Sequence, residues 1–119
     1  MTNKSRAISV REDFGENLLT PEEGLRLYDL IHPELQASRD VVLDFDGVKV
    51  VGSAFLNQAI GKLYADIAPD VIKTHLRMPH ISDIAKFALK KVVANSKEYY
   101  QNSRFREALD ASVDSAFEA

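Results

Sequence analysis

The chain has 119 residues, of which 45% are hydrophobic and 28% are charged, and its formal net charge is −3. This length and balance fit one soluble globular domain with a modest core. The absence of cysteine excludes disulfides, thiolate metal sites and cysteine nucleophiles, and no stretch resembles a signal peptide or a membrane span. We therefore expect a cytoplasmic protein with no membrane partner.

The chain divides into a short start, one domain and a tail. Residues 1–5 are polar and are expected to be frayed. Residues 6–102 are expected to form the domain, and residues 103–119 a helical C-terminal tail. Within the domain, alternation at 6–13 predicts a short strand with one exposed face, and a turn is predicted at 14–17.

The next segment carries the signals of a helix start. Thr20 can cap the first free amides, Pro21 suits the first helical position, and Glu23 can complete a capping box. Pro33 disfavours helical geometry in the residue before it, so the helix is predicted to end or kink at His32.

The middle of the chain predicts a buried strand followed by a helix. Residues 41–45 are almost wholly apolar, as expected of a strand in a parallel sheet. After a turn and an extended segment, a helix is predicted from Ser53 or Ala54 to about Ala68. Gly61 lies inside this predicted helix, where glycine lowers helix stability by about 1 kcal/mol relative to alanine. Its presence there indicates that another part of the chain packs closely against Gly61.

The second half predicts one more strand and a long helix. Pro69 is expected to end the preceding helix, and residues 71–76 to form a third strand. Ser82 is the predicted N-cap of the last main helix. The predicted buried face of that helix consists of Ile81, Ile84, Ala85, Ala88, Leu89, Val92 and Val93.

Charge is distributed unevenly along the chain. Residues 1–72 have a balance of −5, residues 73–106 of +6, and the last thirteen residues of −4 with no base. The basic block at 73–106 is interpreted as a solvated helix face. Anion or nucleic-acid binding is the alternative, but no aromatic stripe interleaves the bases. The tail keeps a helical period and is predicted either to dock on the domain or to bind a partner.

Strands that alternate with helices predict an α/β fold. We expect a small, mainly parallel or mixed sheet of about 3–4 strands, packed with 3–4 helices. Ligands and partners of such sheets gather at the carboxyl ends of the strands. This rule draws attention to Asp46 and to the segment Gly52–Ser53, which we call the helix mouth.

A phosphatase site is the first chemistry to weigh. The run from Asp44 to Val48 resembles the first motif of the haloacid-dehalogenase phosphatases, in which Asp44 would attack phosphorus, Asp46 would handle the leaving-group proton and Mg²⁺ would assist. A strand and a helix precede the motif here, however, and no adjacent acidic pair follows Ile67. The alternative is a turn in which these aspartates bond local amides.

Other catalytic patterns are absent. Gly61 and Lys62 lack the spacing of a phosphate loop, and Ser53 lacks the nucleophile-elbow pattern. The histidines, at 32, 75 and 80, do not have the spacing of a metal site. We therefore predict no catalytic residue, no metal and no cofactor.

The motifs together resemble a known family. Phe14-Gly15, Leu19-Thr20, the strand Asp44–Val48, the helix start Ser53–Leu56 and the pair Tyr99-Tyr100 occur in the order of the STAS-like bacterial family DUF4325. That family is related to STAS domains and anti-sigma factor antagonists. The resemblance implies a STAS-like fold and a non-catalytic regulatory module that binds a partner protein.

The resemblance also suggests which residues contact the partner. In anti-sigma antagonists the helix mouth reads Asp-Ser-Ser-Gly, and an ATP-dependent kinase phosphorylates the second serine. Gly52, Ser53, Ala54 and Phe55 stand at those positions, so the phosphate acceptor is replaced by alanine; Ser53 is predicted to cap the helix instead. The implied partner is an ATP-binding, histidine-kinase-like protein, and the candidate contact residues are Asp46, Gly47, Gly52, Ser53, Ala54, Phe55, Asn57 and Gln58.

Overall fold

The protein is described by a computed structural model that covers the backbone of residues 5–117 and the side chains of residues 5–101. Two small sheets, both with parallel strands, form its centre. The α/β class and the parallel pairing predicted from the sequence are therefore confirmed. The larger sheet has the order β1 (Arg6–Ser9), β3 (Val41–Asp44), β5 (Leu76–Arg77), and the smaller one pairs β2 (Asn17–Leu18) with β4 (Val50–Val51).

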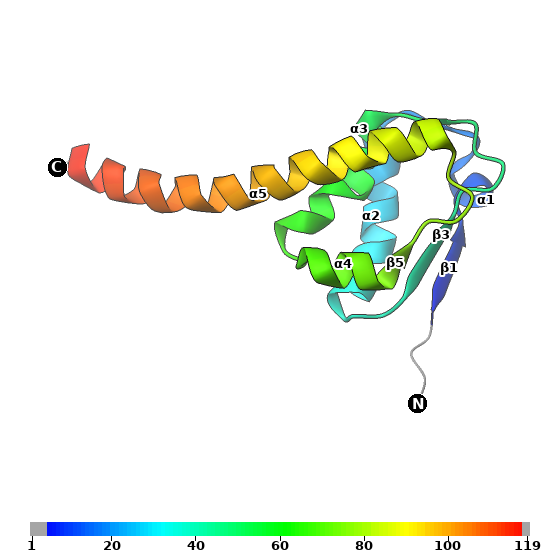
Figure 1. Ribbon diagram of the computed structural model, residues 1–119, viewed down its shortest axis with the longest axis horizontal. Helices are drawn as coiled ribbons and strands as arrows, with labels where there is room; N and C mark the ends of the chain where they lie inside the picture. Colours follow the sequence, from blue (N-terminus) through cyan, green and yellow to red (C-terminus); the bar gives the residue numbers. More distant parts are fainter. Residues whose placement is uncertain (1–4, 118–119) are drawn as a thin grey trace.

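Helices connect the strands, and the last of them leaves the body of the molecule (Figure 1). The Cα radius of gyration is 16.4 Å, whereas a compact chain of this length would have about 13.5 Å. The projecting end of the last helix accounts for the difference. The helices are α1 (Val10–Phe14), α2 (Pro21–Gln36), α3 (Ser53–Ala59), the 3₁₀ helix η1 (Gly61–Ala65), α4 (Pro69–His75) and α5 (Asp83–Phe117).

The core lies between the larger sheet and helices α2 and α3. In the sheet, Ile8 of β1 is in register with Leu43 of β3, and both side chains are buried. Burial on this face repeats every second residue, as strand geometry requires. The buried side chains that meet this face include Leu27, Ile31 and Leu35 from α2 and Phe55, Leu56 and Ala59 from α3.

The first strand is shorter than predicted. It ends at Ser9, whose hydroxyl accepts a hydrogen bond from the Glu12 amide at 3.4 Å. Ser9 therefore caps helix α1, and the predicted strand at 6–13 is wrong beyond Ser9 because a side-chain cap turns the chain at that point.

Helix α2 begins as predicted but ends later. The Glu23 amide donates to the Thr20 hydroxyl oxygen at 3.2 Å, which confirms the predicted cap. The predicted end at His32 is wrong, because α2 continues through Pro33 to Gln36. The helix hydrogen bond that proline removes would reach Asp29, and both residues are exposed, so water can satisfy the free carbonyl.

The predicted helix up to Ala68 is broken. Helix α3 ends at Ala59, and η1 follows from Gly61. A Cβ at Gly61 would lie 2.6 Å from Ser96 Oγ and 3.3 Å from Val92 Cγ1 of α5. The predicted close packing at Gly61 is confirmed.

The segment after Pro69 differs most from the prediction. Residues 69–75 form helix α4, with Pro69 in its first turn, and only the two-residue β5 follows. The predicted strand at 71–76 is therefore wrong. The predicted role of Pro69 in ending the preceding helix is also wrong, because η1 ends at Ala65 and Pro69 instead begins α4, whose first turn suits its ring.

Helix α5 starts at its predicted cap. The Ala85 amide donates to Ser82 Oγ at 3.1 Å, which confirms the capping role. Ala85 and Val92 are buried, but Ile84 is 85% exposed, so its predicted place on the buried face is wrong. The helix continues unbroken to Phe117; the docking of the tail's side chains and the fraying of residues 1–4 lie outside the described residues.

Candidate partner-binding site

Asp44 ends the central strand and organises the turn that follows. Its Oδ1 accepts a hydrogen bond from the Asp46 amide at 2.9 Å and lies 2.9 Å from His80 Nδ1. The Val48 amide donates to the Phe45 carbonyl at 3.0 Å, which closes a turn over residues 45–48. Gly47 is the third residue of this turn and has φ +82°, a backbone conformation that favours glycine. The predicted role of Asp44 in bonding a local amide is confirmed.

The contact between Asp44 and His80 changes both pKa values. The Asp46 amide, and then His80, lower the pKa of Asp44, while the Asp44 carboxylate raises the pKa of His80. The contact therefore favours the charged form of both groups. It joins the end of β3 to the segment before α5, which is also held by a hydrogen bond from the Phe45 amide to the Pro79 carbonyl at 3.0 Å.

Arg11 covers the outer side of this turn. A Cβ at Gly47 would overlap the Arg11 side chain, so the glycine also makes room for it. Arg11 Nε lies 3.3 Å from Glu16 Oε2, and Lys49 Nζ lies 3.4 Å from Glu16 Oε1. These cations lower the pKa of Glu16 and hold the turn beside β2.

The helix mouth is held by the smaller sheet. The Gly52 amide donates to the Leu18 carbonyl at 2.7 Å, and the Gly52 carbonyl accepts from Leu56 at 3.1 Å. Gly52 is the N-cap residue of α3, and no side chain caps this helix. The predicted capping role of Ser53 is therefore wrong, because Ser53 is the first helical residue and its side chain is exposed.

The candidate contact residues of α3 divide into two groups. Ser53, Ala54 and Asn57 are exposed, and Gln58 is half-buried. Phe55, in contrast, is 0% exposed. Its predicted place on a contact surface is corrected: it belongs to the buried core, together with side chains of α2 and of the larger sheet.

Two apolar side chains beside the helix mouth were missed by the sequence analysis. Leu19 is 54% exposed and Val50 is 46% exposed, and Leu19 Cδ2 would lie 3.4 Å from a Cβ at Gly52. Both belong to extended segments next to a less exposed residue, Leu18 and Val51 respectively. The alternation of strand side chains was the signal that could have identified them.

A polar hollow of about 460 Å³ lies between α3, η1 and α5. Asn57 and Gln58 line one side of it, and Asn95, Ser96 and Tyr99 line the other. Two of the predicted contact residues therefore face this hollow, whereas Asp46 and Gly47 lie on the separate turn after β3.

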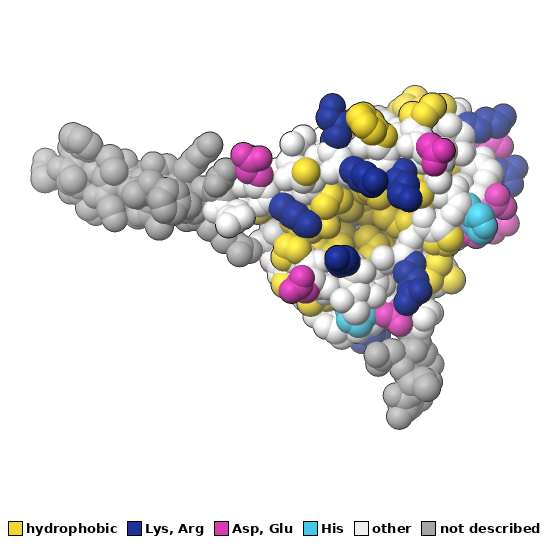
Figure 2. Space-filling model, viewed as in Figure 1, with side chains coloured by type: hydrophobic (Ala, Val, Ile, Leu, Met, Phe, Trp, Pro, Cys, Tyr) yellow, Lys and Arg dark blue, Asp and Glu magenta, His cyan; other side chains and the backbone are white. Residues whose placement is uncertain are grey.

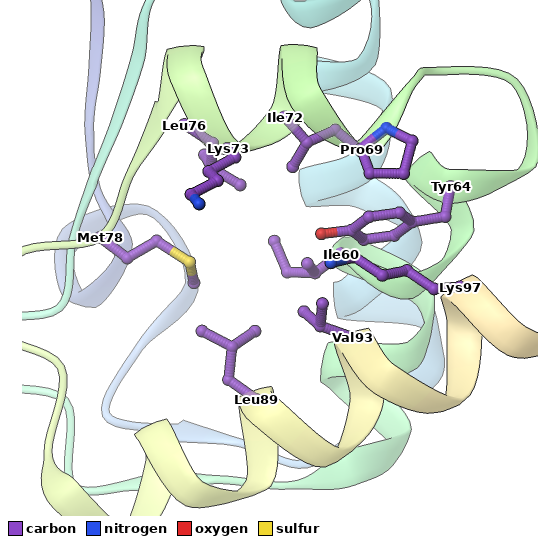
Figure 3. A pocket seen from close by; sticks show the side chains of 10 residues that line it. All are labelled: Ile60, Tyr64, Pro69, Ile72, Lys73, Leu76, Met78, Leu89, Val93 and Lys97. Carbon is purple, nitrogen blue, oxygen red and sulfur yellow. The ribbon is translucent and has the colours of Figure 1, made fainter.

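A second hollow is apolar and carries a basic rim. This groove, which we call the α4–α5 groove, has a volume of about 280 Å³. Figure 2 shows apolar side chains at its bottom and Lys and Arg side chains around it. Its lining includes Ile60, Tyr64, Ile72, Met78, Leu89 and Val93, with Lys73 and Lys97 at the edges (Figure 3).

The geometry does not assemble a phosphatase centre within the described part of the chain. Asp44 is bound to the turn and to His80, and residues 5–101 contain no group of three His, Asp or Glu side chains that could hold a metal ion. The three histidines each pair with an aspartate instead: His32 with Asp66, His75 with Asp40, and His80 with Asp44.

The fold and the site define a small α/β domain with parallel strands, an exposed turn and an exposed helix mouth. Residues 23–84, which run from α2 to the start of α5, match the family described as a STAS-like domain of unknown function (DUF4325). The chain belongs to this family, and the resemblance seen in its sequence is confirmed. Comparisons with curated proteins and with solved structures gave no significant match.

In the part of the chain that the structure describes, no helix is both long and apolar enough to cross a bilayer.

Proposed function

We propose that this protein is a non-catalytic regulatory module that binds a partner protein through the surface around the helix mouth. The surface consists of Ser53, Ala54 and Asn57 on α3 together with Leu19 and Val50 beside it. STAS-like domains are generally non-enzymatic, which supports a binding role.

The observation that carries this proposal is the exposure of apolar side chains at an uncapped helix start. Leu19 and Val50 expose about half of their area, and no side chain of the described residues covers the first amides of α3. A contact that buries Leu19 and Val50 would gain hydrophobic free energy of about 25 cal/mol per Å². Apolar anchors surrounded by polar side chains are the usual composition of a transient protein interface.

The kind of partner follows from the family resemblance. Anti-sigma factor antagonists bind ATP-binding, histidine-kinase-like proteins, and we extend this class of partner to the present chain. Control by phosphorylation at the usual acceptor position is not part of the proposal, because Ala54 stands there. Asp46 and Gly47, on the turn after β3, are proposed to contribute to the edge of the contact.

Ala54→Asp is the variant that tests the surface. An acid in the first turn of α3 is favoured by the helix dipole, so the fold is expected to tolerate it. Ala94→Asp on α5 is the matched control, because it makes the same change at another exposed helical position. The protein captured from the native cell by the wild-type chain is identified and purified, and its affinity for all three chains is measured by calorimetry.

We expect Ala54→Asp to weaken binding at least about tenfold, as truncation or charging of an interface centre does, and Ala94→Asp to leave it unchanged. Equal binding by all three chains would contradict the proposed surface. A captured partner that binds no ATP would contradict the proposed class of partner and leave the surface standing.

A further inference from the structure

The α4–α5 groove lies apart from the proposed partner surface and requires its own explanation. Its walls come from α4 and α5, and its bottom from Ile60 at the junction of α3 and η1. Tyr64 also lines it, and burial raises the pKa of this tyrosine. An open apolar groove of about 280 Å³ is large enough to receive several apolar side chains of another segment.

The charge at the edge of the groove limits what it can bind. Lys73 on α4 and Lys97 on α5 both belong to the lining, which contains no acid. Figure 3 shows the two lysines on opposite sides of the open space. Within residues 5–101, neither lysine has an ion-pair partner. An occupant that is apolar in the middle and acidic at its edges would complement this groove.

Two further lysines extend the basic edge along α5. Lys86 lies three residues before Leu89, and Lys90 lies three residues before Val93. Residues three apart are neighbours on a helix surface, so both lysines border the groove side of α5. Figure 2 shows the resulting arrangement, with basic side chains around an apolar hollow.

The C-terminal segment of this chain has the complementary composition. Residues 107–119 contain four acids and no base. Phe105, Leu109, Val113 and Phe117 recur at four-residue intervals, the spacing of one apolar helix stripe. Helix-in-groove recognition uses such anchors.

We propose that the α4–α5 groove binds the C-terminal segment, residues 103–119, of a second copy of this chain. The segment cannot reach the groove of its own chain while α5 remains one continuous helix, because α5 carries it away from the body (Figure 1). A second copy brings the same segment to the groove without bending the helix.

The groove and the apolar stripe of the segment lie on opposite faces of α5. Val93 in the groove and Val113 in the stripe are twenty residues apart, which at 3.6 residues per turn corresponds to about 200° around one continuous helix. Each copy can therefore receive a segment in its groove while its own segment reaches the groove of a further copy. Such a contact is heterologous, and the copies associate head to tail.

A charge-swap experiment on the full chain tests the proposal by analytical ultracentrifugation. The wild type is expected to form species larger than the 13.3 kDa monomer, and this association is expected to weaken at high salt because the ion pairs are screened. Two variants reverse the charge on one side of the contact: Lys73→Glu/Lys97→Glu in the groove and Asp110→Lys/Asp114→Lys in the segment. Each should raise the dissociation constant roughly tenfold or more, because repulsion replaces attraction. An equimolar mixture of the two variants restores opposite charges at both kinds of contact and should associate again.

Three results would overturn the proposal. The first is a wild type that stays monomeric at low salt up to about 1 mM, the limit of weak specific association. The second is a pair of variants that associate like the wild type, and the third is a mixture that does not associate again. Circular dichroism checks that both variants are folded.

A second measurement does not depend on variants. Wild-type chains labelled with ¹⁵N are mixed with unlabelled chains, and carbodiimide joins neighbouring lysines and carboxylates. Cross-links of mixed isotope composition between Lys73 or Lys97 and residues 107–118 are expected. Cross-links found only within one isotope population would show docking inside a single chain and would refute the exchange between copies.

Discussion

Gly24 provides the most direct test of the packing between α2 and α3. A Cβ at this position would overlap the Phe55 carbonyl oxygen and would lie 2.9 Å from Gln58 Cβ. The obstacle is backbone, which cannot rotate away as a side chain can. We therefore predict that Gly24→Ala destabilises the protein, although alanine is the better helix former.

The expected magnitude is the difference between two effects. Alanine stabilises a helix interior by about 1 kcal/mol relative to glycine. Overpacking a close contact costs about 1–3 kcal/mol, and a backbone obstacle places this case near the upper value. The net loss is about 2 kcal/mol, which is a substantial part of the roughly 5–15 kcal/mol that stabilises a typical domain.

Urea unfolding followed by circular dichroism measures the loss. With an m-value of about 1.5 kcal/mol per M, the midpoint should fall by roughly 1.3 M. Asp29→Ala, an exposed change on the same helix, is the control for helix propensity and should raise the midpoint slightly, because alanine is the better helix former. A Gly24→Ala protein as stable as the wild type would refute the close approach of the two helices.

Three further predictions follow from side-chain contacts. Gly61→Ala should lower the free energy of unfolding, measured with urea, by about 1 kcal/mol. Adding Ser96→Ala should restore most of this loss, because it removes the oxygen that lies 2.6 Å from the new Cβ. A double variant as unstable as Gly61→Ala would show that Ser96 is not the obstacle. In an NMR titration, the pKa of His80 should lie above its ordinary value of 6.5, and Asp44→Asn should lower the pKa of His80. The stabilisation from this pair is present below 6.5 as long as Asp44 is ionised, and it is lost as pH rises through the raised pKa of His80. The stability difference between the wild type and Asp44→Asn should therefore narrow at alkaline pH, and a difference that stays constant would contradict the pairing. Ser82→Ala should cost about 1 kcal/mol in the same unfolding assay, whereas Ser82→Asp should be nearly neutral; equal losses would exclude a capping role.

The parts of the fold that were predicted correctly depend on contacts between near neighbours. Thr20 and Ser82 each accept from an amide three residues later, so both ends of the contact are visible in one short stretch of sequence. The buried strand at 41–44 was identified in the same way, from consecutive apolar residues. Local chemistry was sufficient in these cases.

The parts that were missed depend on distant contacts. No residue close to Asn17 in the sequence indicates that Asn17 pairs with Val50. Pro33 and Pro69 give the same local signal, yet one lies inside a helix and the other begins one; packing of the neighbouring residues decides which.

The candidate site was predicted only in part. The position of the helix mouth after an extended segment followed from the change in hydrophobic period. The burial of Phe55 did not, because an apolar residue at a helix start is equally consistent with a core or a surface role. Leu19 and Val50 were not recognised as exposed because each adjoins a more buried apolar residue. Leu18 precedes Leu19, and Val51 follows Val50.

The strand pairing has a consequence for how this chain folds. The pairs Arg6 with Val41, Asn17 with Val50, and Val41 with Leu76 join residues that are 35, 33 and 35 positions apart. Parallel strands cannot form by local hairpin closure, and such long-range pairing slows folding compared with a helical bundle of equal length. During synthesis, one edge of β3 therefore stays unpaired until Arg77 has left the ribosome, and any nascent chain that stalls before that residue presents an open strand edge to its neighbours.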